Sequence, residues 1–561
     1  MTFVPHPLGS GSDDVPGVAI SRRGPIGVEP DYLPVPVRSV AAGMLGTILV
    51  AGGGIGAASV VEPDPVLDGT AFSWLGYGHG KQMSVFVVYV GIALLVWSWV
   101  RLGRAARAGA VDRRGVLAAV GAWTLPLLVA PPLFSRDLFT YLAQGDLALH
   151  GLNPYHHGVS DLDDHLSANV DPRWQNTPTP YGPLFILVAK SVVLITGQST
   201  VVGVIAMRVT LCVGMVLLCW ALPRLAERLG GSPTVALWLG AANPLVLLYL
   251  VGGGHNDLLM VGLLAAGTVL VLDGRYRRGF LLVTLALAVK ATAGVLLPFL
   301  VLVWASRRQG QWGRRLAMAA LSAIAVVVPT FAACTLLAGV DLGWLPALST
   351  SNLVIDWLSL PTGAGQLVYI VGGLFGHLSL NDILNVTRPV GWLILVALVV
   401  RQWWLARDEP DATVIRRAAL ALLAVILCSP ATLPWYFSWA LVIAAGLAWS
   451  RRGLVIATGC STLIALLNLP DGSIGLYKAG YLAAAVLAGW LAAVSLVRPD
   501  PLRLSVWPRV RDAMPRSRSD ETPNRDVDYG EQQATDTRPP FGGLRAGRDQ
   551  PVRTPGPEPG A

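Results

Sequence analysis

Apolar residues in this chain come in repeated runs of about 20 residues, separated by short segments that carry arginine. The runs are neither alternating nor heptad-like, and each is long enough to cross the hydrocarbon core of a bilayer as an α-helix. The chain is 53% hydrophobic and 14% charged, with a mean hydropathy of +0.56. The sequence therefore predicts an all-α polytopic membrane protein of about 13 to 15 transmembrane helices, with the lipid bilayer as its surroundings.

The basic residues indicate how the chain threads the membrane. The net charge is +8, but the arginines gather in short clusters between apolar runs, as is typical of cytoplasmic loops. The charge therefore reports topology, and we expect no nucleic-acid partner. Together with these clusters, the runs predict spans at residues 38–60, 83–102, 114–134, 231–252, 257–274, 316–338, 386–406, 417–433, 436–450, 453–469 and 479–497.

Both ends of the chain differ in composition from its apolar centre. Residues 1–37 are rich in proline and glycine and lack the apolar segment of a signal peptide, which predicts a disordered cytoplasmic leader. Residues 499–561 are rich in proline and charged residues, which predicts a disordered cytoplasmic tail. We expect residues 38–498 to form the membrane domain, in the plasma membrane.

Two regions do not fit a simple alternation of spans. Between Tyr181 and Leu222 the chain must cross the membrane an odd number of times but has two apolar runs, so residues 181–197 are expected to be re-entrant or interfacial. Residues 279–306 have arginines on both sides and are too short for two spans of about 20 residues. A pair of half-helices meeting near Lys290 is expected there, because broken helices are tolerated where they line a cavity inside the protein.

The polar motifs fall on one side of the membrane once the spans are counted, and this is the extracytoplasmic side. Arg136 and Asp137 stand where the third span ends and an acidic, aromatic loop begins. Helical spacing places Asp137, Tyr141 and Gln144 on one face, where they can grip a sugar, with Asp137 as the catalytic carboxylate. The alternative is an interfacial ion pair or a helix cap.

A second motif, His255, Asn256 and Asp257, follows three consecutive glycines. Such a turn permits close approach of a ligand to the backbone. The alternative is the polar start of a helix, with Asn256 or Asp257 as the N-cap. These three residues alone do not form a metal-ligand set, and all five cysteines lie in apolar segments without CxxC spacing. Neither a metal site nor a disulfide framework is predicted.

Isolated cations and aromatic residues complete the set of candidates. Lys290 interrupts an apolar run, and a cation within the membrane indicates function because its burial is costly. A lipid phosphate is its expected partner, and snorkelling to the interface is the alternative. Snorkelling or an ion pair is the stronger interpretation for Lys190 and Arg208. Trp435 and Tyr436 either stack on a sugar or belong to an ordinary interfacial aromatic belt.

In these motifs the chain resembles the GT-C superfamily of polyprenyl-phosphate-sugar-dependent glycosyltransferases. In particular it is similar to the actinobacterial α-(1→6)-mannopyranosyltransferases of lipomannan synthesis, MptA and MptB. The matching segments, in order along the membrane domain, are residues 134–145, 151–155, 179–184, 253–257, 289–291, 429–430 and 433–436. The resemblance implies a GT-C-like helical bundle with an external first loop whose catalytic carboxylate is Asp137. It also implies polyprenyl-phosphate mannose as donor and a lipoglycan as acceptor, outside the plasma membrane.

Roles for the motif residues are expected as follows. Arg136, Lys290 and His255 bind the donor phosphate. Contacts to the sugar or the acceptor are expected from Tyr141, Gln144, Asp146, Tyr155, Tyr181, Asn256, Asp257, Trp435 and Tyr436. Where superfamily members have a paired acidic motif, this chain has Arg-Asp, so a divalent cation is compatible with the pattern but not indicated, and no other cofactor is expected.

The predicted function is inverting transfer of mannose to the 6-hydroxyl of a mannoside in a lipomannan or lipoarabinomannan backbone. A phosphate is already a good leaving group, so a single carboxylate, acting as general base, is enough. The alternatives are a transferase of another polyprenyl-linked sugar, arabinose or glucose, and a lipid-linked sugar flippase or transporter. A transporter predicts repeated halves, and no internal repeat is apparent. A polymer ligase predicts an external loop with key arginines, whereas the largest loop here is acid-rich.

Overall fold

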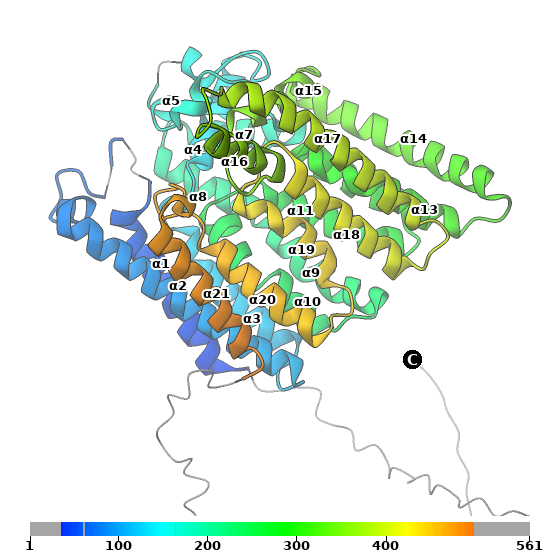
Figure 1. Cartoon of the computed structure of the whole chain (residues 1–561), viewed down its shortest axis with the longest axis horizontal. Helices are drawn as coiled ribbons and strands as arrows, with labels where there is room; N and C mark the ends of the chain where they lie inside the picture. The colour runs from blue at the N-terminus through cyan, green and yellow to red at the C-terminus, as the bar shows by residue number, and fades with distance from the viewer. Residues whose placement is uncertain (1–34, 60–61, 65, 163, 499–561) are drawn as a thin grey trace, which may run out of the picture. The chain divides into compact units, whose positions relative to one another are not determined.

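The computed structural model describes residues 35–59, 62–64, 66–162 and 164–498 (Figure 1). The predicted tail and all but the last three residues of the predicted leader lie outside these ranges. The chain divides into two units, Met1–Leu502 and Arg503–Ala561. All that follows concerns the first unit.

Every regular element of the described residues is a helix, and no strand occurs among them, as the sequence predicted. The first ten α-helices are α1 (Val37–Ala57), α2 (Gly78–Arg107), α3 (Arg113–Leu128), α4 (Asp137–Leu149), α5 (His165–Ala168), α6 (Pro172–Gln175), α7 (Pro183–Thr196), α8 (Thr200–Leu211), α9 (Val213–Leu229) and α10 (Pro233–Gly240). They are followed by α11 (Asp257–Leu272), α12 (Tyr276–Val289), α13 (Leu297–Ser306), α14 (Trp312–Ala338), α15 (Trp344–Ala347), α16 (Leu360–Gly372), α17 (Leu380–Leu405), α18 (Asp411–Cys428), α19 (Phe437–Ala445), α20 (Arg451–Ala465) and α21 (Ala479–Ser495). The π-helix is η3 (Val246–Gly252), and the 3₁₀ turns are η1 (Ser73–Gly76), η2 (Val159–Asp161), η4 (Ala291–Leu296), η5 (Leu348–Leu353), η6 (Pro434–Tyr436) and η7 (Gly475–Tyr477).

Several of these helices are built to lie in a membrane. By length and composition α1, α2, the α8–α9 segment, α14 and α17 can each cross a bilayer, and η3 with α11 forms a further pair bent by 116°. Only 11% of the apolar window of α14 and 17% of that of α17 is buried inside the protein. Such an outward apolar surface is stable against lipid tails and not against water. The unit is therefore a multi-pass membrane protein, and most of the other predicted spans are present as shorter helices.

The predicted break at Lys290 is present in the structure. α12 ends at Val289, Lys290 is extended with φ −151° and ψ 128°, and η4 leads into α13. The 14 residues of α12 rise about 21 Å, less than the roughly 30 Å of a hydrocarbon core. α7 also has only 14 residues, and it is followed by the long α8–α9 segment. The two apolar runs after Tyr181 therefore form one short helix and one full-length span.

The prediction of one continuous span at residues 231–252 is wrong. α10 ends at Gly240, and the chain becomes helical again at Pro244, just before η3. Pro244 has no backbone N–H to continue the helical ladder. The side chain of Asn243 accepts a hydrogen bond from the backbone N–H of Leu245 instead, at 2.9 Å. Local turn chemistry at these two residues thus interrupts a run that is apolar enough to be read as one helix.

Glycine allows α9 and α11 to pack with their backbones in contact. A Cβ atom at Gly214 of α9 would overlap the backbone carbonyl of Leu258, and one at Gly262 of α11 would overlap the backbone of Gly214. Only hydrogen side chains permit this separation. The close approach fixes the N-terminal end of α11, which begins at Asp257.

Candidate active site

The turn that leads into α4 is held in an unusual conformation. Phe134 has φ +65°, in the left-handed region that non-glycine residues rarely adopt. Its backbone N–H donates to the carbonyl of Pro470 at 2.9 Å, and its carbonyl accepts from the Asn468 amide at 3.2 Å. Such a conformation costs on the order of 1 to 3 kcal/mol and persists where the surroundings over-determine it. The strain directs Asp137, the first residue of α4, toward the residues described next.

The Asp137 carboxylate, 18% exposed, faces a fully buried histidine. The Tyr141 hydroxyl donates to Oδ2 of Asp137 at 3.4 Å, and Nε2 of His255 lies 3.6 Å from the same oxygen. Nδ1 of His255 is 2.7 Å from the carbonyl of Tyr249. A carbonyl only accepts, so Nδ1 carries a hydrogen and Nε2 is the atom that faces Asp137. The pair is placed to exchange a proton with a hydroxyl that binds between them.

Glycine at position 254 brings these two residues together. Gly254 has φ +65°, and a Cβ atom there would lie 2.5 Å from a methyl group of Leu138 on α4. Both the left-handed backbone and the contact with α4 therefore require glycine. The three-glycine turn therefore packs closely on α4, which places His255 next to Asp137.

Lys290 has a protein carboxylate as its partner, whereas the sequence suggested a lipid phosphate. Its Nζ lies 2.9 and 3.0 Å from the two oxygens of Asp257, which is fully buried. The Trp439 indole donates to the same carboxylate at 2.5 Å. The Lys290 side chain is 13% exposed. An ammonium has three N–H donors, so contacts to the two Asp257 oxygens leave one for another acceptor.

Aromatic rings surround the Lys290 ammonium on its other sides. Nζ lies 4.6 Å from the ring centroid of Tyr436, 5.3 Å from that of Trp439 and 5.9 Å from that of Tyr181. Tyr436 and Trp439 stack at 4.3 Å. Rings at this range attract the cation through their electron-rich faces. Trp435 stacks on the imidazole of His255 at 3.8 Å, so one face of that indole is already covered.

Three buried polar atoms in this region have no hydrogen-bond partner among the described residues. They are Nδ2 and Oδ1 of Asn256 and Nε2 of His255. Leaving a buried polar atom unpaired costs about 1 to 3 kcal/mol, so natural structures rarely keep one without a reason. The backbone N–H of Asn256 donates to the Tyr141 hydroxyl at 3.5 Å, which ties Asn256 to Asp137. Unsatisfied atoms beside a carboxylate are suited to a polar ligand.

These residues come from five separate parts of the chain and form one group, which we call the site cluster. Its members are Asp137, Tyr141, Tyr181, His255, Asn256, Asp257, Lys290, Trp435, Tyr436 and Trp439. The predicted set shares nine of these ten; Trp439 carried no assigned role. Its position four residues after Trp435, on one face of a helix, is the signal that could have identified it.

Three predicted sugar-binding residues are engaged elsewhere in the protein. Gln144 accepts from the Thr179 hydroxyl at 3.0 Å, and Asp146 accepts from the Gln198 amide at 3.0 Å. Tyr155 donates to the backbone carbonyl of Tyr181 at 2.9 Å. All three predicted residues are buried. Their contacts fix the first loop on α4, and Tyr155 positions the backbone of Tyr181.

An arginine that the sequence analysis did not assign lies near the cluster. Arg173 on α6 is held by the carboxylate of Asp171, with nitrogen–oxygen distances of 3.0 and 2.8 Å. Although burial opposes the shift, hydrogen bonds from Arg173 lower the pKa of Asp171, and the charge of Arg136 adds to this. The hydrogen bonds to Asp171 raise the pKa of Arg173 against the effect of burial, and the negative charges of Asp171 and Asp137 add to this. Arg136 and Arg173 thus add positive charge that acts on Asp137. The sequence feature that could have identified Arg173 is its position as a single arginine, next to a tryptophan, in an otherwise acidic loop.

Arg208 does not snorkel, and it forms no ion pair with the residues that the structure describes. It is 1% exposed and donates to four backbone carbonyls. These carbonyls belong to Leu128, Ala130, Pro131 and Gly252. The first three precede α4 and the fourth precedes His255, so one guanidinium joins the two segments that carry the site cluster.

Replacing Arg208 by glutamine is expected to lower the free energy of unfolding by roughly 2 to 4 kcal/mol, because several buried carbonyls lose their donors. Arg224 is the matched control, since it is exposed and its guanidinium bonds only to the carbonyl of Trp220 on its own helix. Thermal unfolding of the purified proteins in detergent, followed by tryptophan fluorescence, measures the difference. An Arg208→Gln protein that unfolds at the same temperature as Arg224→Gln would contradict this role.

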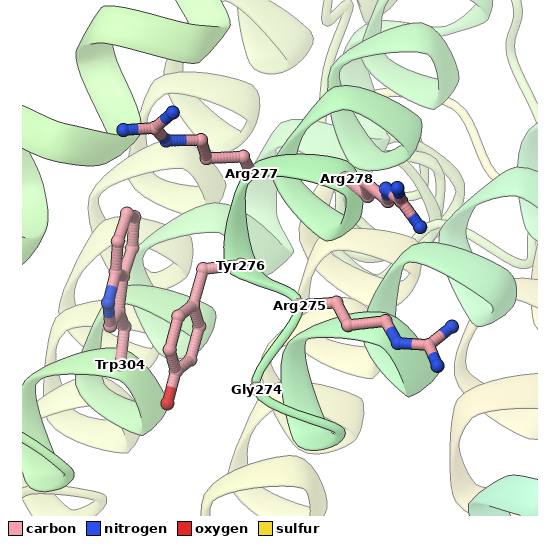
Figure 2. Close-up of a pocket in the computed structure, with 6 residues that line it drawn as sticks. All are labelled: Gly274, Arg275, Tyr276, Arg277, Arg278 and Trp304. Atoms are coloured by element: carbon pink, nitrogen blue, oxygen red, sulfur yellow. The ribbon is translucent and has the colours of Figure 1, made fainter.

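A separate surface hollow of about 450 Å³ lies where α11, α12 and α13 meet. Figure 2 shows Tyr276 and Trp304 with their rings face to face, 4.7 Å apart, while Arg277 extends away from Arg275 and Arg278. The lining contains no carboxylate, and its arginines do not converge on one point. The hollow therefore lacks an acid or base, and it fits a basic rim that meets the membrane surface. Among the described residues no group of three or more His, Cys, Asp or Glu side chains is placed to hold a metal ion.

Comparison with known proteins identifies the family. Residues 40–306 match the family model for the α-(1→6)-mannopyranosyltransferase N-terminal domain, and residues 361–498 match that for the MptB C-terminal domain. The chain is 42% identical over 441 residues to α-(1→6)-mannopyranosyltransferase A of Mycobacterium tuberculosis, covering 78% of this chain and 85% of the relative. It is 31% identical over 466 residues to the enzyme of that name from Corynebacterium glutamicum, covering 79% and 95%. The resemblance found in the sequence is confirmed: the chain belongs to the α-(1→6)-mannopyranosyltransferase family of membrane glycosyltransferases.

Proposed function

We propose that the protein transfers mannose from polyprenyl-phosphate mannose to the 6-hydroxyl of a mannoside in a cell-envelope lipoglycan, at the extracytoplasmic face of the plasma membrane. The observation that carries the proposal is the site cluster itself. A partly exposed carboxylate, Asp137, lies 3.6 Å from a buried imidazole, and the Tyr141 hydroxyl that donates to it also contacts Asn256, whose side-chain amide atoms are unsatisfied. The curated relatives are named as mannopyranosyltransferases, which supports mannose as the sugar.

Asp137 acts as the general base in this proposal. Its carboxylate accepts the proton of the acceptor's 6-hydroxyl as that oxygen attacks the anomeric carbon of the donor. The bond between the anomeric carbon and the phosphate oxygen breaks in the same step, and the carrier leaves as a polyprenyl phosphate. A β-linked donor is thereby inverted to an α-mannoside. General-base catalysis of this kind contributes on the order of 10² to 10⁴ in rate.

The Tyr141 hydroxyl and His255 keep Asp137 ready for this step. The hydroxyl donates to the carboxylate at 3.4 Å and holds its orientation. Nε2 of His255, 3.6 Å away, can take up the proton that Asp137 collects. The unsatisfied amide of Asn256 offers the two N–H donors of Nδ2 and the acceptor Oδ1 to the hydroxyls of a sugar.

Charge that builds on the departing phosphate is stabilised by cations already in place. Lys290 has one N–H donor beyond its two contacts with Asp257, and Arg136 and Arg173 add positive charge on the side of Asp137. Preorganised charges are most effective where water is excluded. Because Asp257 neutralises part of the Lys290 charge, the two arginines have a larger share of this role than the sequence suggested.

Membrane orientation follows from the arginine clusters. Arg104 and Arg107 lie in the last turn of α2, Arg275 precedes α12, whose first turn holds Arg277 and Arg278, and Arg307 with Arg308 follow α13. The positive-inside rule assigns these loops to the cytoplasm. Figure 1 shows α4, α5, α7 and α15 gathered at one end of the unit, away from the α13–α14 and α9–α10 loops. The loop after Asp137 then faces the extracytoplasmic side.

The donor assignment is tested with membranes from cells that express the protein. Radiolabelled polyprenyl-phosphate mannose and a short α-1,6-mannoside are supplied, and the product is digested with an α-1,6-specific mannosidase. We expect labelled, digestible product with the lipid donor, and none with GDP-mannose when carrier synthesis is blocked. Equal transfer from GDP-mannose under that block would contradict the donor assignment, and transfer from polyprenyl-phosphate arabinose or glucose alone would contradict the sugar.

A further inference from the structure

A groove of about 640 Å³ runs between α2, α20 and α21, on residues that the proposed reaction does not use. α2 contributes residues at helical spacing, including Tyr89, Trp97 and Arg104, and α21 contributes Tyr481 followed by a series of alanines. Figure 1 shows α2, α20 and α21 side by side. The volume lies in the range of sites that bind a small molecule, and the lining is almost wholly apolar.

The two ends of this groove differ in charge. At one end the hydroxyls of Tyr89 and Tyr481 are hydrogen-bonded at 3.1 Å. At the other end lies Arg104, whose Nη1 is buried and has no hydrogen-bond partner among the described residues. Arg104 is the one charged residue of the described lining, and its charged neighbour Arg101 has the same sign. No carboxylate of the described residues forms an ion pair with this guanidinium, and an anion at this end would be stabilised.

The length of the groove matches one leaflet of a bilayer. Tyr89 and Arg104 are separated by about 22 Å along the axis of α2, at about 1.5 Å per residue. Half of a bilayer, from its midplane to the outside of the headgroups, is about 20 to 22 Å. A lipid with its headgroup at Arg104 would extend its chain as far as the paired tyrosines.

We propose that this groove binds an anionic phospholipid of the cytoplasmic leaflet, with one acyl chain against the alanines of α21 and the phosphate on Arg104. The proposal rests on the membrane orientation given above and not on the catalytic assignment. The donor carrier does not fit the same groove in a productive way. A carrier that reacts at Asp137 needs its phosphate toward the extracytoplasmic side, away from Arg104, and the described lining at the tyrosine end contains no cation.

The test is native mass spectrometry of delipidated protein titrated with equimolar phosphatidylglycerol and phosphatidylcholine. Wild type is expected to bind one phosphatidylglycerol in preference to phosphatidylcholine. Arg104→Gln is expected to weaken phosphatidylglycerol binding at least about fivefold. Arg224→Gln, which removes an arginine outside the groove lining, is the matched control and is expected to bind as wild type does. Ala488→Phe keeps Arg104 but fills the groove, and it is expected to lose the lipid as well.

Three outcomes would overturn the proposal. Equal binding of phosphatidylglycerol by wild type and Arg104→Gln would show that the arginine does not hold the phosphate. Equal binding of the two lipids by wild type would remove the charge selectivity. Retention of polyprenyl phosphate in the groove, lost in Ala488→Phe, would assign the site to the carrier. Mannose transfer from the lipid donor is measured in parallel in membranes with wild-type protein and with Arg104→Gln. A failure of the donor assignment then appears as absent transfer in both, independently of the lipid-binding result.

Discussion

Replacing Asp137 by asparagine is expected to lower mannose transfer by at least about a hundredfold, and up to about ten-thousandfold, while donor binding is retained. Asparagine keeps the size of the side chain and can still accept a hydrogen bond from the Tyr141 hydroxyl. It cannot accept the proton of the attacking hydroxyl. Single-turnover transfer from radiolabelled polyprenyl-phosphate mannose measures the chemical step, and equilibrium binding of the same donor measures retention of the site.

The matched control for this substitution is Asp161→Asn. Asp161 lies in the same loop after α4, is exposed and pairs with His157 at 2.7 Å. It has no contact with the site cluster among those described, so its variant is expected to transfer mannose at the wild-type rate. An Asp137→Asn enzyme within about tenfold of wild type would remove Asp137 from the role of base. If Asp137→Asn loses both donor binding and transfer, the role of Asp137 is to bind the donor.

Replacing Lys290 by methionine is expected to lower the free energy of unfolding by roughly 3 to 5 kcal/mol and to abolish transfer. Asp257 is fully buried, and removing its partner leaves an uncompensated charge inside the protein. Chemical denaturation in detergent, with transfer assayed on the same samples, measures both effects. Arg113→Met is the control, because the Arg113–Glu227 pair is about half exposed on both sides and its loss should cost about 1 kcal/mol or less.

A double substitution separates the structural role of Lys290 from its role in the reaction. Lys290→Met combined with Asp257→Asn removes both charges of this buried pair, and the asparagine can still accept from the Trp439 indole. We expect most of the lost stability to return and transfer to stay at least about tenfold below wild type, because the donor phosphate lacks its cation. A double variant with both stability and transfer restored would show that Lys290 serves only to neutralise Asp257.

The sequence predicts the depth of each motif in the membrane better than it predicts which other residues the motif contacts. Run lengths and arginine clusters place Asp137, His255 and Trp435 at the same end of their spans, and the structure brings all three together. The break at Lys290 was predictable for the same reason, because two flanking basic groups forced a return within too few residues. Depth says nothing about lateral contacts, so the pairing of Lys290 with Asp257 could not be read from the sequence.

Packing decided the cases in which sequence reasoning failed. Helical spacing correctly placed Asp137 and Tyr141 on one face of α4, but Gln144, one turn further, is covered by Thr179 from a distant loop. The residues next to Arg208 in the sequence do not indicate that its hydrogen-bond partners are backbone carbonyls from two other segments. Hydropathy treats Pro244 as one more residue of a run, although its missing N–H interrupts the ladder of helical hydrogen bonds.

The central claim is that Asp137 works at the extracytoplasmic surface, and thiol labelling tests it most directly. Ser160 in the loop after α4 and Gln309 in the α13–α14 loop are both exposed. Each is replaced by cysteine in a protein whose five native cysteines are changed to alanine, and intact cells are treated with a membrane-impermeant maleimide. We predict labelling of the cysteine at position 160 in intact cells, and of the one at position 309 only after the membrane is permeabilised. The reverse pattern would place Asp137 on the cytoplasmic side and contradict the account.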